Sequence, residues 1–208
     1  TMEETVVAVG VVAEATAWWF VSSRGAEVWR VVTPVLVALG VAAFVFGPPS
    51  WSPEVDPVVA EAVGIGAGVA FYGATRAFVA VTGSWHAFRR HSAELYALRG
   101  DLSLAAALVL SVGVTVTAEE VFWRGFAQPE LARTFEPSVG AVIAWAAFVA
   151  ANASSRNLAV LASAIVGGLV WSALGWWSGG ALAPLGCHVV WTGLMLAFPV
   201  VSREAITG

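Results

Sequence analysis

Lysine is absent from this chain, and all ten of its basic residues are arginine. Charged residues of both signs form 12% of the sequence, whereas a soluble domain carries about 25%. Such sparse positive charge excludes a basic surface large enough to bind nucleic acid. Cys187 is the only cysteine, which excludes an intrachain disulfide. The composition therefore argues against a nucleic-acid-binding protein and against a disulfide-stabilised domain.

Hydrophobic residues are abundant instead, at 59% of the chain, and the mean hydropathy is +0.81. A transmembrane helix needs about 20 apolar residues, within a range of about 17–25. We therefore predict an all-α, polytopic membrane helical bundle of about seven transmembrane helices, in a single integral membrane domain over residues 1–208. The predicted helices span residues 4–21, 29–47, 57–82, 102–127, 137–152, 157–175 and 180–201.

The arginines lie unevenly between the predicted loops. One side of the membrane holds only Arg133, and the positive-inside rule assigns the other side, with its seven arginines, to the cytoplasm. This predicts an outside amino terminus and a cytoplasmic carboxyl terminus. Residues 84–100 mix arginine with aromatic residues and are predicted to form an amphipathic helix on the cytoplasmic surface. The seven arginines are Arg24, Arg30, Arg89, Arg90, Arg99, Arg156 and Arg203. The start of the chain, TMEE, is acidic and lacks the basic region of a signal peptide, so we expect the first segment to be retained.

Three ionisable residues interrupt the fourth apolar segment, in the stretch TVTAEEVFWRGF over residues 115–126. Ionisable residues inside a membrane helix are costly and usually mark a functional site. On a helix, Glu120 and Arg124 are i,i+4 neighbours and are expected to form an ion pair. Glu119 then points about 100° away from Glu120, given 3.6 residues per turn. We therefore expect Glu120 to be neutralised and Glu119 to remain free for chemistry.

Polar residues of the fifth and seventh segments are expected at the same depth in the membrane. Asn152 lies near the end of the fifth segment, and His188 lies early in the seventh. Thr192 follows His188 by about one helical turn, so both side chains face the same way. A rise of about 1.5 Å per residue brings Glu119, Asn152 and His188 to a similar level inside the bilayer. We predict that these three side chains converge around one cavity.

The residues Glu119 to Gly125, EEVFWRG, resemble the EExxxR signature of the CAAX-protease and bacteriocin-processing family, also called the Abi family. The second motif of that family, FxxxH, has its counterpart at Phe148 to Asn152. The third, HxxxN or HxxxD, has its counterpart at His188 to Thr192. The resemblance covers about residues 102–198. It implies an Abi/CAAX-protease-like core and a glutamate-dependent intramembrane endopeptidase in a prokaryotic cell membrane.

The resemblance also implies a role for each matching residue. Glu119 is expected to be the general base that activates water, and His188 to stabilise the oxyanion. Asn152 stands where the family has a water-activating histidine, and it cannot take a proton. Loss of a general acid–base group typically lowers the rate by about 10²–10⁴. The residues expected to support the site are Glu120, Arg124, Phe148 and Thr192, of which the last replaces an asparagine donor.

Three functions of different classes fit these residues. The first is an endopeptidase that cleaves a hydrophobic peptide surrounded by membrane lipid. The second is a non-proteolytic enzyme on the same scaffold that acts on a lipid-like or other hydrophobic small molecule. The third is a catalytically silent member that binds a membrane peptide or partner, in which the charged residues and Asn152 only join helices. No cofactor is expected, and a metal site is not expected because HExxH and a second histidine near His188 are both missing.

Overall fold

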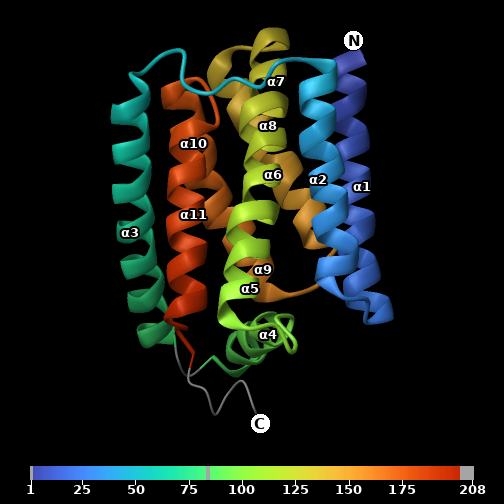
Figure 1. The fold of residues 1–208 in the computed structure, drawn as a ribbon, viewed down its shortest axis with the longest axis vertical. Helices are drawn as coiled ribbons and strands as arrows, with labels where there is room; N and C mark the ends of the chain where they lie inside the picture. Colours follow the sequence, from blue (N-terminus) through green and yellow to red (C-terminus); the bar gives the residue numbers. More distant parts are fainter. Residues whose placement is uncertain (1, 83–84, 202–208) are drawn as a thin grey trace.

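The computed structural model describes residues 2–82 and 85–201 as a bundle whose long helices run along one common axis (Figure 1). Arg203 and Ser84, which belong to the predicted charge asymmetry and the predicted surface helix, lie outside the described residues. The elements are α1 (Met2–Arg24), α2 (Val28–Phe46), α3 (Pro57–Thr82), α4 (His86–Ala97), α5 (Leu104–Leu108), η1 (Val109–Val116), α6 (Thr117–Glu120), η2 (Val121–Ala127), α7 (Gln128–Thr134), α8 (Pro137–Ala153), α9 (Leu158–Ala162), η3 (Ser163–Gly167), α10 (Gly168–Ser178) and α11 (Leu182–Ala197). The three η segments are π-helical turns within longer helices.

Within the described residues, five helices are long and apolar enough to cross a membrane. Two further apolar helices, α8 and α11, have 17 and 16 residues, at or below the usual lower limit of about 17. The predicted all-α membrane bundle is therefore confirmed, whereas the count of seven transmembrane helices stays a prediction. The five are Met2–Arg24, Val28–Phe46, Pro57–Thr82, Leu104–Thr134 and Leu158–Ser178.

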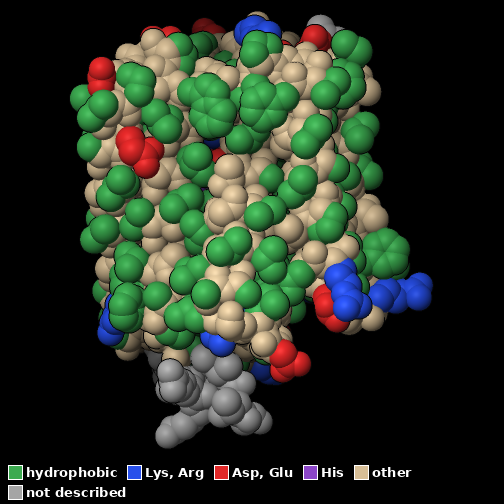
Figure 2. Space-filling view, in the orientation of Figure 1, with side chains coloured by type: hydrophobic (Ala, Val, Ile, Leu, Met, Phe, Trp, Pro, Cys, Tyr) green, Lys and Arg blue, Asp and Glu red, His purple; other side chains and the backbone are tan. Residues whose placement is uncertain are grey.

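Charged side chains gather mostly at the two ends of the bundle, and hydrophobic side chains cover its long sides (Figure 2). The α1–α2 turn, α4 and the α8–α9 turn, which carry most of the arginines, lie at one end, and α7 with Arg133 lies at the other (Figure 1). This arrangement agrees with the predicted asymmetry between loops. Which end faces the cytoplasm stays a prediction.

The predicted amphipathic segment forms α4, which lies across one end of the bundle (Figure 1). The hydroxyl of Tyr96 donates to the carbonyl of Met195 at 3.1 Å, which joins α4 to the end of α11. The ring of His91 accepts from the Leu158 amide at 2.7 Å, at the start of α9. These contacts hold α4 against the start of α9 and the end of α11, the helix that carries the third motif.

Close packing between α3 and α11 determines where the third motif lies. Gly64 and Gly68 form a GxxxG spacing on α3, which permits close approach of two helix backbones. A Cβ atom on Gly64 would lie 2.3 Å from the carbonyl oxygen of Ala183, and one on Gly68 would lie 2.6 Å from that of Cys187. Larger residues are therefore excluded at both positions. This contact places α3 directly beside Cys187, the residue of α11 that precedes His188.

The connection between α2 and α3 joins the first motif to the start of α11. The amide of Ser50 donates to the carbonyl of Gly125 at 2.8 Å, in η2. The carbonyl of Ser50 accepts from the amide of Ala181 at 3.0 Å, immediately before α11. A Cβ atom on Gly180 would lie 2.6 Å from the Ser50 backbone, so the close contact requires glycine. The two helices that carry the first and third motifs are thus linked through one short backbone segment.

Candidate functional site

The paired glutamates occupy an unusual stretch of backbone, because α6 lies between two π-helical segments. π-Helical turns are rare, and they often occur at functional sites. Hydroxyl groups follow the wider register: Thr115 donates to the Leu110 carbonyl at 2.9 Å, and Thr117 donates to the Val112 carbonyl at 3.1 Å. The wider turns change the directions of the side chains around Glu119 and Glu120 from those of a regular α-helix.

Glu120 is the centre of a buried ion network. Its Oε1 atom lies 3.2 Å from Nη1 of Arg124 and 2.8 Å from Nδ1 of His188. The predicted i,i+4 ion pair is therefore confirmed. Nη2 of Arg124 also donates to the Gly168 carbonyl at 3.4 Å, which ties the network to α10. Glu120 thus joins the first motif, the third motif and α10.

Aromatic rings enclose this network. The guanidinium of Arg124 lies 4.5 Å from the ring centroid of Phe148 and 5.6 Å from that of Trp171, within the range of cation–π attraction. The ring of His188 stacks on Trp171, with centroids 3.5 Å apart and planes inclined by 16°. Phe148, the first residue of the second motif, therefore packs against the guanidinium, and Trp171 orients the imidazole.

Glu119 has different surroundings from its neighbour. It is 9% exposed, whereas Glu120 is 0% exposed. Among the described residues, no hydrogen bond or ion pair engages the Glu119 carboxyl group. Glu119 is therefore a buried carboxyl group with unused hydrogen-bonding capacity.

A further carboxyl group, Glu14 on α1, meets the second motif. Its Oε1 accepts from Nδ2 of Asn152 at 2.8 Å, and its Oε2 accepts from Nε1 of Trp123 at 2.8 Å. The motif-based reasoning missed Glu14, because it belongs to a segment more than a hundred residues away in the sequence. The available signal was a single carboxylate inside an otherwise apolar span, which by itself indicates a functional position.

Asn152 contacts Glu14 rather than Glu119. Its Nδ2 atom also donates to the Phe148 carbonyl at 3.0 Å, so both donor hydrogens have partners. Thr192 is half-buried on α11, and no hydrogen bond engages its side chain within the described residues. The supporting role predicted for Thr192 and the water-binding role predicted for Asn152 stay predictions.

The six residues Glu14, Glu119, Glu120, Arg124, Asn152 and His188 are called the polar cluster below. Asn152 contacts Glu14 and His188 contacts Glu120, but no hydrogen bond within the described residues joins Glu119, Asn152 and His188 to one another. Their convergence around one cavity stays a prediction. The cluster contains three carboxyl groups and one guanidinium, in a buried site where unpaired charge is costly. Groups of three or more histidine, cysteine, aspartate or glutamate side chains suited to a metal ion are absent from the part of the chain that the structure describes.

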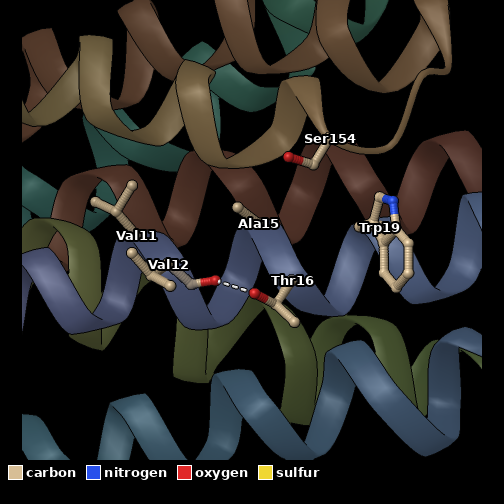
Figure 3. A pocket seen from close by; sticks show the side chains of 6 residues that line it. All are labelled: Val11, Val12, Ala15, Thr16, Trp19 and Ser154. Carbon is tan, nitrogen blue, oxygen red and sulfur yellow. Dashed lines mark hydrogen bonds between the residues drawn. The ribbon is translucent and has the colours of Figure 1, made fainter.

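An open groove lies on the outer surface between α1 and the end of α8 (Figure 3). Its volume is about 340 Å³. None of the polar cluster lines it, and the Thr16 hydroxyl that faces it already donates to the Val12 carbonyl at 2.7 Å. The groove is therefore separate from the candidate site. Its lining consists of Val11, Val12, Ala15, Thr16, Trp19 and Ser154.

A comparison with protein families supports the resemblance seen in the motifs. Residues 101–194 match the family described as Type II CAAX prenyl endopeptidase Rce1-like. The match nearly coincides with the core of residues 102–198 indicated by the motifs, and it contains the whole polar cluster except Glu14. Neither the curated proteins nor the solved structures gave a match to this chain.

Proposed function

We propose, from the match of residues 101–194 to the Rce1-like CAAX prenyl endopeptidase family, that this chain is an intramembrane endopeptidase. Glu119 activates a water molecule that attacks a peptide bond of a hydrophobic membrane peptide. The protein is an integral membrane protein, and the arginine distribution supports a cytoplasmic location for the end that carries α4. A prokaryotic cell membrane is the proposed location.

The difference between the two adjacent glutamates carries this proposal. Arg124 and His188 both bind Oε1 of Glu120, so that carboxylate is held in place. Glu119 is buried at 9% exposure, and no hydrogen bond engages its carboxyl group within the described residues. A general base needs a lone pair within hydrogen-bonding reach of the water that it deprotonates. Glu119 meets that requirement, and Glu120 serves to organise the site.

The geometry of His188 supports a role in stabilising the oxyanion. An ionised Glu120 only accepts hydrogen bonds, so Nδ1–H of His188 donates to it. Nε2 then carries a hydrogen only in the imidazolium form, and that form donates to the developing oxyanion. Stacking on the face of Trp171 and the contact with Glu120 fix the orientation of the ring. His188 therefore contributes a donor when it holds the extra proton.

One observation favours a second candidate function. Asn152 donates to Glu14 and to the Phe148 carbonyl, and no hydrogen bond joins it to Glu119 within the described residues. The water-activating histidine of the family therefore has no direct equivalent at this position. An ester is hydrolysed more readily than an amide. An enzyme that hydrolyses an ester of a lipid-like small molecule therefore needs a weaker general base than a protease does. Such an enzyme is the alternative to the endopeptidase.

Cleavage of a membrane-peptide library in detergent tests the proposed function. Wild type is expected to cleave slowly, and Glu119→Gln is expected to lower the rate by about 10²–10⁴ because it removes the base. Glu27→Gln is the matched control, since Glu27 lies in an exposed ion pair with Arg30 at 3.1 Å. A chelator should leave the rate unchanged. Cleavage that persists in Glu119→Gln would end the proposal, and hydrolysis of lipid esters alone would support the alternative.

A further inference from the structure

The groove between α1 and the end of α8 has no part in the polar cluster or in the proposed hydrolysis (Figure 3). Its α1 residues are spaced at i, i+1, i+4, i+5 and i+8 from Val11, so they form one face of the helix. Ser154 faces them from the end of α8 (Figure 3). Glu14 of the same helix is 0% exposed and contacts the interior of the bundle. The two faces of α1 therefore have different surroundings.

The lining of the groove suits a hydrocarbon chain. Val12 is 65% exposed and Trp19 is 37% exposed on a helix apolar enough to cross a membrane, so the groove opens toward lipid. The Thr16 hydroxyl already donates to the Val12 carbonyl, at 2.7 Å. From Val11 to Trp19 the groove extends about 12 Å along α1, at about 1.5 Å per residue. An elongated apolar ligand fills such a groove and keeps the dispersion contacts that a void would lose.

A positive charge lies at the Trp19 end of the groove. The guanidinium carbon of Arg24 is 5.7 Å from the ring centroid of Trp19, within the range of cation–π attraction. Tryptophan is enriched at the boundary between hydrocarbon and headgroups, which places Arg24 at the level of the headgroups. The side chain of Arg24 is exposed, and it forms no ion pair within the described residues.

A second arginine approaches the same end from the other wall. The Ser22 hydroxyl donates to the Ser154 carbonyl at 3.1 Å, which joins α1 to the α8–α9 turn beside the groove. Arg24 follows Ser22 by two residues, and Arg156 follows Ser154 by two residues. Arg156 is also exposed and forms no ion pair in the part of the chain that the structure describes. Both arginines therefore leave the backbone close to this contact.

Carboxyl groups at this end of the bundle are paired with other arginines. Glu27 lies 3.1 Å from Arg30, and Glu94 lies 3.7 Å from Arg90. Arg24 and Arg156 thus keep their charge for an external anion. Guanidinium groups bind phosphate oxygens through paired N–H donors. A ligand that joins a phosphate to an acyl chain matches both the charged end and the apolar length of the groove.

We propose that the groove binds one acyl chain of an anionic phospholipid, and that Arg24 and Arg156 bind its phosphate. The site lies at the end of the bundle that carries most of the arginines (Figure 1). Anionic lipids attract arginines at a membrane surface, and each arginine contributes about fivefold to binding. The inference is independent of the proposed hydrolysis, because none of the polar cluster lines the groove.

Native mass spectrometry of the purified protein tests the headgroup contact. Wild type in detergent is mixed with equal amounts of phosphatidylglycerol and phosphatidylcholine, and it should retain the anionic lipid at least about fivefold more. Arg24→Gln and Arg156→Gln should each lower that preference by about fivefold. Arg89→Gln is the matched control, because Arg89 is exposed on α4 at the same end and carries the same charge. Equal retention of the two lipids, or an equal loss in Arg89→Gln, overturns the inference.

A phosphatidylglycerol with a photoreactive acyl chain tests the groove itself. Cross-links should map to residues 11–19 and Ser154, and Ala15→Leu should abolish them because leucine fills the groove. Ala62→Leu is the control, since Ala62 is exposed on α3 and lines no part of the groove. Unchanged cross-linking in Ala15→Leu overturns the inference. A change of oligomeric state or of peptide cleavage in Ala15→Leu, with lipid retention unaltered, overturns it in favour of a second copy or a peptide.

Discussion

The polar cluster has two halves, one formed by Glu120, Arg124 and His188 and the other by Glu14, Glu119 and Asn152. The two halves differ in how the charge of their carboxyl groups is compensated. Glu120 has a guanidinium and an imidazole on one oxygen, inside a cage of aromatic rings. Glu14 has only the neutral donors Asn152 and Trp123, and the Glu119 carboxyl group has no hydrogen-bonded donor among the described residues. Adjacent positions of one helix thus carry a compensated and an uncompensated carboxyl group.

This difference indicates a division of tasks between the halves. A carboxylate held by a guanidinium and an imidazole is a poor base, because protonation would break the ion pair with the guanidinium. A carboxyl group that makes no hydrogen bond to the protein keeps its lone pairs available to a water molecule. We therefore assign folding and orientation to the half around Glu120, and proton transfer to the half around Glu119.

The largest expected effect comes from breaking the compensated half. Arg124→Ala leaves Glu120 buried without its guanidinium, and removal of one partner of a buried ion pair typically costs about 3–5 kcal/mol. We expect a clear loss of folded yield and melting temperature, larger than for Glu119→Gln. The measurement is thermal unfolding in detergent, with Arg90→Ala as the exposed control. Unchanged stability of Arg124→Ala would refute the assignment of folding to this half.

An intermediate effect is expected from the uncompensated half. Trp123→Phe keeps an aromatic ring but removes the indole donor, so Glu14 loses one of its two hydrogen bonds. Loss of a partner for a buried polar group costs about 1–3 kcal/mol. We expect a smaller fall in stability than for Arg124→Ala, together with a changed pH profile of cleavage. A stability loss with an unaltered profile would show that Trp123 only packs.

Several of these features could be predicted from the sequence, because they depend on local spacing. The ion pair of Glu120 with Arg124 follows from the i,i+4 positions, and the third predicted helix, residues 57–82, has the bounds of α3. A bound Glu120 beside a Glu119 without hydrogen bonds was also expected, although the π-helical turns on both sides depart from 3.6 residues per turn. The apolar composition sufficed for the all-α membrane bundle.

The contacts that were missed are those between segments distant in the sequence. Glu14 meets Asn152 across 138 positions, and His188 meets Glu120 across 68, so no local pattern encodes either contact. The π-helical turns of η1 and η2 were missed as well, since the spacing of apolar residues in an almost wholly apolar segment does not reveal the backbone register. The length of α8 and α11 likewise depends on packing rather than composition.

The smallest effect on stability and cleavage is expected at Thr192. Substitutions there test whether the polar cluster extends one helical turn beyond His188. Its hydroxyl has no hydrogen bond within the described residues, so Thr192→Val removes no interaction that the fold uses. We expect a change in stability within about ±0.5 kcal/mol and unchanged cleavage. Thermal unfolding and the peptide assay measure both quantities on the same preparation.

Thr192→Asn is the matched variant, because asparagine provides a longer donor on the face of α11 that carries His188. One preorganised donor to an oxyanion is worth about 10²–10³ in rate when it is correctly aimed. A gain in cleavage by Thr192→Asn would indicate that an oxyanion forms near His188. No effect of Thr192→Val would indicate that Thr192 itself donates no hydrogen bond to that oxyanion. A marked loss of cleavage in Thr192→Val would contradict this, because it would extend the catalytic group one helical turn beyond His188.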